Sequence, residues 1–468
     1  MSDTRDPGTH LAGEVPAVPE VGEVPAAPEA IARAKELAAE FEPDLVEFTR
    51  RLVRTPSITG DEHAVSELLL AQMRSLGYHH AFRDSWGNVV GWVDGLAEGP
   101  SILFNGHMDV VEEGNGAKWS PFVPWGGELA VVPTPDADHT AVEEVEVVHG
   151  RGSSDLKGGA AAQLYAGAIL SRLREEGYVW PGRFLCVQVA MEEPGEMFSM
   201  RKFVADTMPE HAIAVDAMVC CEPSSLKVAL GHRGRVELKV VVHGRSCHGS
   251  SPWLGVNAAV HAARLICAIE DEVAAHALVD PHLGRSQIAL TMVDIAPNAL
   301  AIIPDTATLI FDRRIVPGET PDSVVAQVQG VIDRLANEVP EFNAEVEVNT
   351  YYRRSYTGRA DTIASAKESW LIEEDHPFVR ACGAGLEAVG EPFVTTHWPF
   401  STDVPAVANG LGKPCIGYSA GQEFCIHTEE ERIRTDYLKR SLVGNVGLYL
   451  QAAGLPMSSF TVGAAHGS

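Results

Sequence analysis

Two adjacent carboxylates follow an apolar run that is typical of a buried strand. The run covers residues 184–190, and Glu192 and Glu193 come directly after it in the segment MEEPGE. Successive side chains of a strand point to opposite faces, so the pair is ordinary if the strand has already ended and both side chains are solvated. If the pair lies at a strand end that faces a pocket, the two carboxylates can do two different chemical jobs.

Several other predicted strands also end in side chains that can bind a metal. In α/β sheets the working residues gather at the carboxyl ends of strands. The residues at these ends are His107, Asp109, Asp155, Glu192, Glu193, Glu222 and His427. A single carboxylate there is most often a helix N-cap or a solvated loop residue, and Asp155 alone would be interpreted in that way. Together they form an imidazole and carboxylate set that suits zinc, and less strongly cobalt or manganese.

The elements that position these residues alternate between short apolar strands and helices. Strands are predicted at 88–93, 101–110, 183–191 and 216–223, and a long Ala-rich helix is predicted at 158–177. This alternation favours an α/β domain with a largely parallel sheet. An acidic stretch rich in Pro and Gly, residues 119–149, interrupts the pattern and predicts an additional surface hairpin.

A second unit is predicted within residues 235–352. Its order is strand, helix, strand, strand, helix, strand, with elements at 236–245, 257–275, 286–295, 307–316, 320–339 and 344–352. This β-α-β-β-α-β order is the split ferredoxin-like unit. Because the α/β pattern resumes afterwards, the second unit is inserted into a split first domain. The predicted divisions are therefore 1–30, 31–234, 235–352 and 353–468.

Length and charge limit the classes of protein and partner. With 468 residues the chain is too long for one ordinary core, so two domains are expected. The formal charge of −28 makes nucleic acid an unfavourable partner. No apolar run approaches the roughly 20 residues that span a bilayer, and the N-terminus lacks a basic region before an apolar core. We therefore expect a protein that is neither membrane-embedded nor secreted by that route.

Cysteine spacing and the N-terminal composition add two further expectations. The eight cysteines are scattered without CxxC pairs, so neither a disulfide framework nor a zinc knuckle is indicated, and a reducing cytoplasm fits best. Residues 1–30 are rich in Pro, Ala, Glu and Val and contain the repeated segment EVPA. This composition predicts a disordered tail.

The motifs GHMDVV, GRGSSDLKGG, MEEPGE, CEPS and RSCHGSSPWLGVNA occur in this order along the chain. In this order they resemble the dinuclear zinc aminoacylase and carboxypeptidase family, which contains acetylornithine deacetylase, succinyl-diaminopimelate desuccinylase and glutamate carboxypeptidase. The resemblance covers nearly all of the chain beyond the tail. It implies a zinc-peptidase-like α/β catalytic domain with a mixed sheet, and it makes the ferredoxin-like insertion (235–352) a lid domain. It also implies hydrolysis of the amide bond of an N-acyl amino acid or a small peptide-like substrate.

The same resemblance implies two divalent metal ions, most simply zinc, and assigns their ligands. His107, Asp155 and Glu222 would hold one ion, while Glu193, Asp155 and His427 would hold the other. Asp155 would bridge the two. Two ions about 3.5 to 4 Å apart can generate hydroxide from a shared water and polarise the scissile carbonyl.

Catalytic roles follow from the resemblance as well. Glu192 would face the shared water as the general base, and Asp109 would orient the imidazole of His107. In the lid domain, His248 would stabilise the developing oxyanion, often in the active site of the partner subunit. A homodimer formed through the lid domain is therefore expected.

Two lid residues are candidates for binding the small-molecule substrate. Arg314, in the segment FDRRIVPGE, can pair bidentately with a substrate carboxylate, whereas its neighbour Arg313 is expected in a structural ion pair. Asn298 would make a polar contact with the substrate. Its spacing to the following Ile-Pro in PNALAIIPD departs from the pattern of the family.

Other interpretations of the sequence stay open. The segment GYSAG fits the G-x-S-x-G elbow, so a serine hydrolase acting through Ser419 is the main alternative from another class. Against it, Ser419 comes late and leaves little chain to supply the acid and the histidine. A non-catalytic metal-binding protein and a dipeptidase or carboxypeptidase of the same family are the others. Cys247 lacks a separate base and orienting acid for a thiol nucleophile, so it is expected to be a packing residue.

Overall fold

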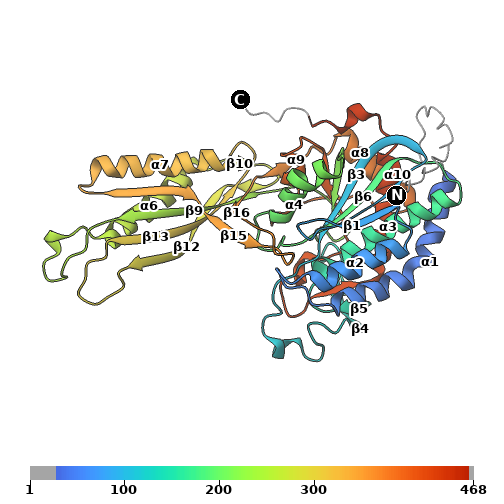
Figure 1. Cartoon of the computed structure of the whole chain (residues 1–468), viewed down its shortest axis with the longest axis horizontal. Coiled ribbons are helices and arrows are strands. Elements are labelled where there is room, and N and C mark those ends of the chain that lie inside the picture. Colours follow the sequence, from blue (N-terminus) through green and yellow to red (C-terminus); the bar gives the residue numbers. More distant parts are fainter. Residues whose placement is uncertain (1–27, 463–468) are drawn as a thin grey trace, which may run out of the picture.

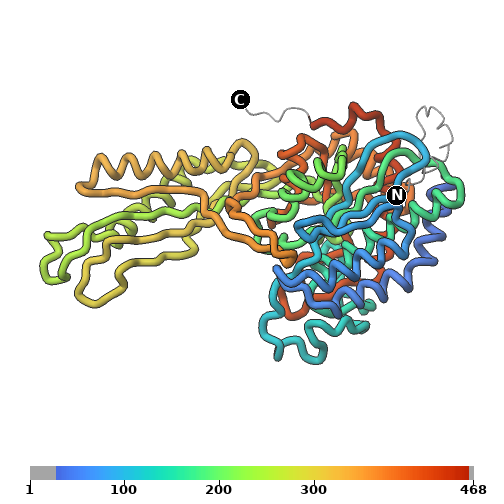
Figure 2. Tube along the Cα trace, viewed as in Figure 1, coloured from blue at the N-terminus to red at the C-terminus, as the bar shows by residue number. Residues whose placement is uncertain are grey.

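The computed structural model describes residues 28–462. Figure 1 shows two parts, a larger domain of strands covered by helices and an elongated lid domain that projects from it. Figure 2 shows the chain running out through the lid domain and returning to the larger domain. The disordered tail predicted at 1–30 lies outside the described residues except at its end, where helix α1 (Pro28–Val53) already begins. None of the helices within 28–462 is long and apolar enough to cross a bilayer.

The larger domain is organised around one nine-stranded mixed sheet. Its central strands are parallel, and antiparallel pairs flank them on both sides. The mixed sheet implied by the resemblance is confirmed. The largely parallel sheet predicted from the alternation of strands and helices is correct only for the centre, because the edges are built from hairpins and very short strands. The order is β1 (His80–Arg83), β2 (Val89–Asp94), β6 (Pro181–Val189), β3 (Ala97–His107), β7 (Ala217–Cys220), β20 (Cys415–Gly417), β8 (Val228–His232) and β18 (Trp370–Leu371), with β19 (Thr395–Trp398) beside β8.

Helices bury the central strands. Strand β3 and strand β6 are buried along continuous runs, as expected for parallel strands covered on both faces. The predicted Ala-rich helix is α3 (Gly158–Glu175), which is buried along most of its length because it packs against its neighbours α1 and α10 (Thr435–Ala452). The other helices of this domain are α2 (His63–Ser75), α4 (Phe198–Lys202), α5 (Met208–Glu210), α8 (Pro377–Val389), α9 (Pro405–Ala408) and α10 (Thr435–Ala452).

The hairpin predicted within 119–149 is present. It consists of β4 (Leu129–Pro135) and β5 (Val142–His149), which pair antiparallel. A third strand, β21 (Arg432–Arg434), pairs with β5 and completes a small separate sheet. The insertion is thereby attached to the segment of chain that follows His427.

The lid domain has the predicted ferredoxin-like order. Its sheet runs β12-β13-β9-β14 with antiparallel neighbours, and helices α6 and α7 cover it. Alternate residues of β9, such as Val236, Leu238 and Val240, are fully buried, which is the period expected for a sheet with one covered face. The elements are β9 (Gly234–His243), α6 (Ala258–His276), β10 (Val279–Asp280), β11 (Gly284–Arg285), β12 (Gln287–Ala296), β13 (Thr306–Ile315), α7 (Pro321–Glu338) and β14 (Asn343–Val348).

The last predicted lid strand, 344–352, is divided in the structure. Strand β14 ends at Val348, and β15 (Thr350–Arg354) then pairs with β16 (Ala360–Ala364) in a two-stranded ribbon. The turn of this ribbon bonds to the larger domain, because Ser355 Oγ donates to the carbonyl of Trp86 at 2.6 Å. Strand β17 (Ala366–Lys367) then pairs with the first residues of β9.

Candidate metal centre

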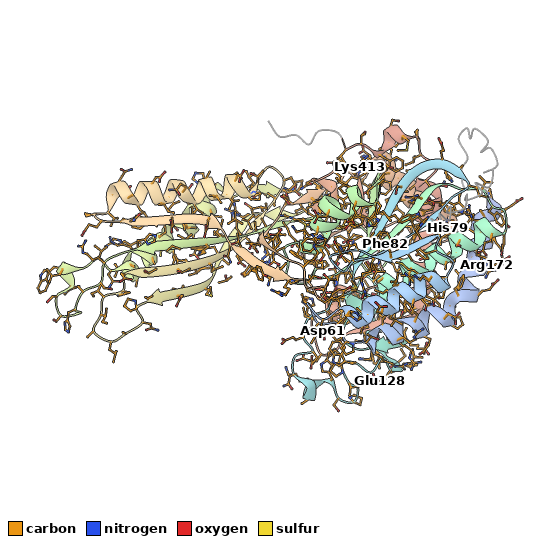
Figure 3. All side chains as sticks on the ribbon, viewed as in Figure 1. Asp61, His79, Phe82, Glu128, Arg172 and Lys413 are labelled. Carbon is orange, nitrogen blue, oxygen red and sulfur yellow. The ribbon has the colours of Figure 1, made fainter. Side chains whose placement is uncertain are left out.

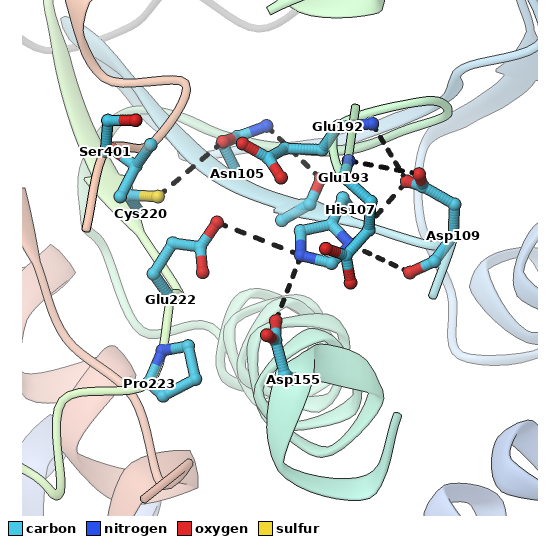
Figure 4. A network of polar contacts seen from close by, with 12 residues as sticks. Asn105, His107, Asp109, Asp155, Glu192, Glu193, Cys220, Glu222, Pro223 and Ser401 are labelled. Carbon is cyan, nitrogen blue, oxygen red and sulfur yellow. Dashed lines mark hydrogen bonds and ion pairs between the residues drawn. The ribbon is translucent and has the colours of Figure 1, made fainter. Parts of the chain in front are cut away.

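The predicted ligands converge at one edge of the central sheet. Strands β6, β3, β7 and β20 are parallel neighbours, so their carboxyl ends lie side by side. His107 ends β3, and Glu193 and Glu222 follow β6 and β7 by a few residues. Figure 4 shows these side chains pointing toward one another, with Asp155 at the start of the helical segment that leads into α3.

Asp155 contacts two imidazoles with its two oxygens. Its Oδ1 lies 3.2 Å from His107 Nε2, and its Oδ2 lies 3.1 Å from His427 Nε2. Glu222 Oε1 is 3.8 Å from the same nitrogen of His107, and Glu193 Oε2 is 3.2 Å from that of His427. The geometry therefore divides the five predicted ligands into two groups that share Asp155.

The electrostatics of this cluster fit a site for cations. Burial and, to a smaller extent, the charge of Asp155 raise the pKa of Glu193 to about 7. Burial likewise holds the pKa of Glu222 well above its usual range. Hydrogen bonds to Asp155 and Glu193 raise the pKa of His427 to about 10. Glu193 Oε1 is buried and has no hydrogen-bond partner within the described residues. An orphaned carboxylate oxygen among imidazoles and further carboxylates is the donor set that divalent metals take.

Asp109 holds this cluster together through both its backbone and its side chain. His107 Nδ1 lies 2.9 Å from the Asp109 carbonyl oxygen and 3.6 Å from its carboxylate. A donor Nδ1–H here leaves Nε2 of His107 free to bind a metal. The Asp109 carboxylate instead accepts the backbone N–H groups of Glu192 and Glu193, at 3.0 and 3.2 Å. Asp109 thus orients the imidazole mainly through its backbone and the glutamate pair through its side chain.

The two adjacent glutamates point to different partners. Glu193 contacts His427, whereas Glu192 Oε1 accepts a hydrogen bond from the buried Lys367 Nζ at 2.5 Å. Ligand atoms of Glu192 also lie within 4.8 Å of those of His107 and Glu222. Glu192 is therefore next to the candidate metal ligands and outside the contacts that centre on Asp155.

Two supporting residues were not predicted from the sequence. Glu431 is fully buried, and its Oε1 accepts the backbone N–H groups of Ser154 and Asp155 at 3.1 Å each. Its other oxygen pairs with Arg151 at 2.5 Å, so Glu431 fixes the turn that carries Asp155. Lys367 is the second. No local sequence pattern indicates a role for either residue, because Glu431 ends a run of three glutamates and Lys367 is a single polar residue in a short strand.

Arg314 lies beside the candidate metal centre. A cavity of about 350 Å³ is lined by Arg314, Arg235 and Asp312 from the lid domain, by Lys367 at the domain junction, and by Glu192 and the candidate ligands other than His107 from the larger domain. Arg314 Nε donates to Asp312 Oδ1 at 2.6 Å, and Arg235 Nε donates to the other oxygen at 2.8 Å. Arg313 instead forms the predicted ion pair, with Glu319.

His248 and Asn298 are not near the metal ligands of their own chain. Strand β9 leaves the larger domain at Gly234 and rises about 3.3 Å per residue up to His243, and His248 lies beyond its far end. Asn298 lies in the β12–β13 connection at the same end, because Thr306 pairs with His243. Both residues are exposed. Within one chain the structure therefore separates these two candidates from the site.

The serine alternative is not supported by the geometry. Ser419 is fully buried, and its Oγ accepts a hydrogen bond from the backbone N–H of Gly421 at 3.3 Å. No histidine within residues 28–462 bonds to it. Cys247, in turn, directs its Sγ to the carbonyls of His248 and Ser251.

Comparison with known proteins agrees with this arrangement. Residues 230–340 match the family described as the peptidase dimerisation domain. The chain is 28% identical to the protein YgeY of Escherichia coli (strain K12) over 86% of this chain and 93% of that protein. It is 27% identical to the succinyl-diaminopimelate desuccinylase of Rhodospirillum centenum over 63% of this chain and 73% of that protein.

A solved structure shares the fold. It is the YXEP protein of Bacillus subtilis, described as a dinuclear metal binding peptidase from the M20 family, with a TM-score of 0.58 and 12% identity over 89% of this chain and 99% of that chain. The ordered motifs, the inserted domain and these similarities agree with one another. Together they support the M20 family of zinc aminoacylases and carboxypeptidases for this chain, and the chain is a metal-dependent hydrolase that acts on amide bonds.

Proposed function

We propose that this enzyme cleaves the amide bond of an N-acyl amino acid or a small peptide-like substrate, with two divalent metal ions at its centre. Zinc is the preferred metal, with cobalt or manganese as substitutes. The observation that carries the proposal is the contact of Asp155 with His107 on one side and His427 on the other. The similarity to a succinyl-diaminopimelate desuccinylase supports an acylated amino acid as the substrate.

The residues of the chain divide the chemical work. Metal ions held by the five candidate ligands would supply a Lewis acid for the scissile carbonyl and would lower the pKa of the attacking water. Glu192 accepts the proton of the attacking water and returns it to the nitrogen of the leaving amine. Arg314 pairs with a substrate carboxylate from the lid side of the cavity. His248 donates a hydrogen bond to the carbonyl oxygen as negative charge develops on it.

For His248 to act in this way, a second subunit must supply it. In its own chain His248 lies at the far end of the lid domain, where Trp253 and Leu300 are 75% and 99% exposed. Strand β12 is an exposed edge of the lid sheet and offers a place for pairing. We infer a homodimer formed through the lid domain, and the match to a peptidase dimerisation domain supports it.

The cysteines support a location in the cytoplasm. All eight are free thiols, and six of them are buried. Free thiols are typical of a reducing compartment.

Mixing two inactive variants should restore activity. A His248→Ala chain and a Glu192→Gln chain would form mixed dimers in which one site keeps both residues. After equal mixing and subunit exchange, about a quarter of the sites should be complete. The measurement is the rate of amide hydrolysis after exchange, beside each variant treated alone. Absence of rescue, with exchange confirmed by mass spectrometry of tagged chains, would contradict a site shared between subunits.

The substrate class is tested with a panel of compounds. Purified protein loaded with zinc, cobalt or manganese should hydrolyse a subset of N-acyl amino acids or dipeptides. Ureido compounds serve as a third class. Metal stripping should abolish the activity and metal addition should restore it. Hydrolysis that persists in the stripped protein would return the serine alternative to consideration.

A further inference from the structure

Lys367 is a buried cation in direct contact with the proposed general base. Its side chain is 1% exposed, and its Nζ lies 2.5 Å from Glu192 Oε1. Burial of an ammonium group is costly unless a paired charge and hydrogen bonds offset it. Within residues 28–462, no other side chain donates a hydrogen bond to the Glu192 carboxylate. The contact occupies one carboxylate oxygen and leaves the other, Oε2, without such a bond.

The backbone of Lys367 is fixed where the chain leaves the lid domain. In strand β17, Lys367 pairs with Arg235 of β9, so both sides of the domain junction hold it. The fit is close, because a Cβ added at Gly234 would lie 2.5 Å from the Lys367 carbonyl oxygen. The Nζ also lies 3.5 Å from the Ser401 carbonyl oxygen of the larger domain. Lys367 therefore reaches Glu192 from a defined position.

The chain segment that leaves the lid domain also binds Glu196, the last residue of the MEEPGE segment. Arg353 of β15 pairs with both carboxylate oxygens of Glu196, at 2.9 Å from Nε and 2.5 Å from Nη2. The side chain of Glu196 is 1% exposed. The segment that leaves the lid domain thus binds Glu192 and Glu196, on either side of the candidate ligand Glu193.

We propose that Lys367 is a positioning residue for Glu192. Its ammonium group holds Oε1 so that Oε2 faces the cavity as the proton acceptor. Residues that orient the working side chains of a site through hydrogen bonds typically contribute about 10- to 100-fold to activity. The inference rests on the proposed function, because it takes Glu192 to be the base. If Lys367 only balanced buried charge, its replacement would change kcat by the same factor whether or not Glu192 is present.

The test is a double-mutant cycle of Lys367→Ala and Glu192→Gln. Lys367→Ala alone should lower kcat by about 10- to 100-fold, with little change in KM and with metal content retained. In the Glu192→Gln background the same substitution should cause little further loss, because residues that act as a unit are not additive. Ethylammonium should restore part of the activity of Lys367→Ala and none of that of the double variant.

Three results would overturn the inference. The first is that Lys367→Ala lowers kcat by the same factor in the wild-type and Glu192→Gln backgrounds. The others are a rise in kcat when Lys367 is replaced, and a loss of metal together with activity. If instead Glu192→Gln itself keeps activity, the proposed function fails, which is a separate outcome. Lys413 pairs with Asp216 at the surface of the larger domain (Figure 3), so Lys413→Ala is the matched control. Thermal unfolding checks that each variant folds, and Lys367→Gln enters the same cycle if the alanine variant does not.

Discussion

Replacing Glu192 by Gln is expected to lower kcat by about 10²- to 10⁴-fold, the usual contribution of a general acid-base group. The amide keeps the size and shape of the side chain but cannot accept the proton of the attacking water. Because Glu192 points to Lys367 and lies outside the contacts that centre on Asp155, the metal ligands should be undisturbed. Turnover and metal content, measured on the same gel-filtered sample, check both parts of this expectation.

Glu193→Gln is the matched control, because it makes the same chemical change at the neighbouring position. Glu193 contacts His427 and carries the orphaned oxygen, so its replacement removes a charged ligand. Metal content should therefore fall together with activity. If Glu192→Gln loses metal while Glu193→Gln retains two ions and loses only turnover, the two roles are reversed. If both variants keep metal and activity, the site lies elsewhere.

Replacing Asp155 by Asn is expected to remove both ions and to reduce turnover by more than the ~10⁴-fold upper range of a general base. Asp155 is the residue shared by both ligand groups, and a neutral amide cannot offer an anionic oxygen to each. His107 and His427 would also lose their charged partner, which would add to the loss of turnover. The measurement is metal analysis beside the rate of hydrolysis.

Stability gives a second readout for Asp155→Asn. A metal that binds only the folded state raises the midpoint of thermal unfolding. Added zinc should therefore stabilise the metal-stripped wild-type protein and leave Asp155→Asn unchanged. Asp216→Asn makes the same change in a carboxylate that pairs with Lys413, so it should respond to zinc as the wild type does. An equal response of Asp155→Asn would contradict a bridging role.

The convergence of the ligands could be predicted because each motif is local and the sheet rule is general. His107, Asp155, Glu193 and Glu222 each follow or precede a clear apolar run, and parallel strands bring such ends together. The order of the lid domain was equally readable from alternating residues in β9 and from the periodic helix α7. The ligand motifs and the lid elements can each be recognised within a short window of sequence.

The remaining features depend on contacts between distant segments. Strands β18, β20 and β21 are two or three residues long, so they carry no period from which pairing direction can be inferred. Lys367 and Glu431 become notable only through burial, which no local pattern encodes. The distance of His248 from its own site follows from the direction in which the lid domain projects. The chain leaves and re-enters the larger domain at one junction, where β17 pairs with the first residues of β9.

The measurement that tests the central claim most directly is a calorimetric titration of the metal-stripped protein with zinc or cobalt, with turnover followed in parallel. A centre bridged by Asp155 should bind two equivalents per chain, and hydrolysis of the amide substrate should return as they bind. Asp155→Asn, titrated in the same way, should bind neither tightly. Full turnover before any metal is added, or tight binding of two ions by Asp155→Asn, would contradict a shared two-metal centre.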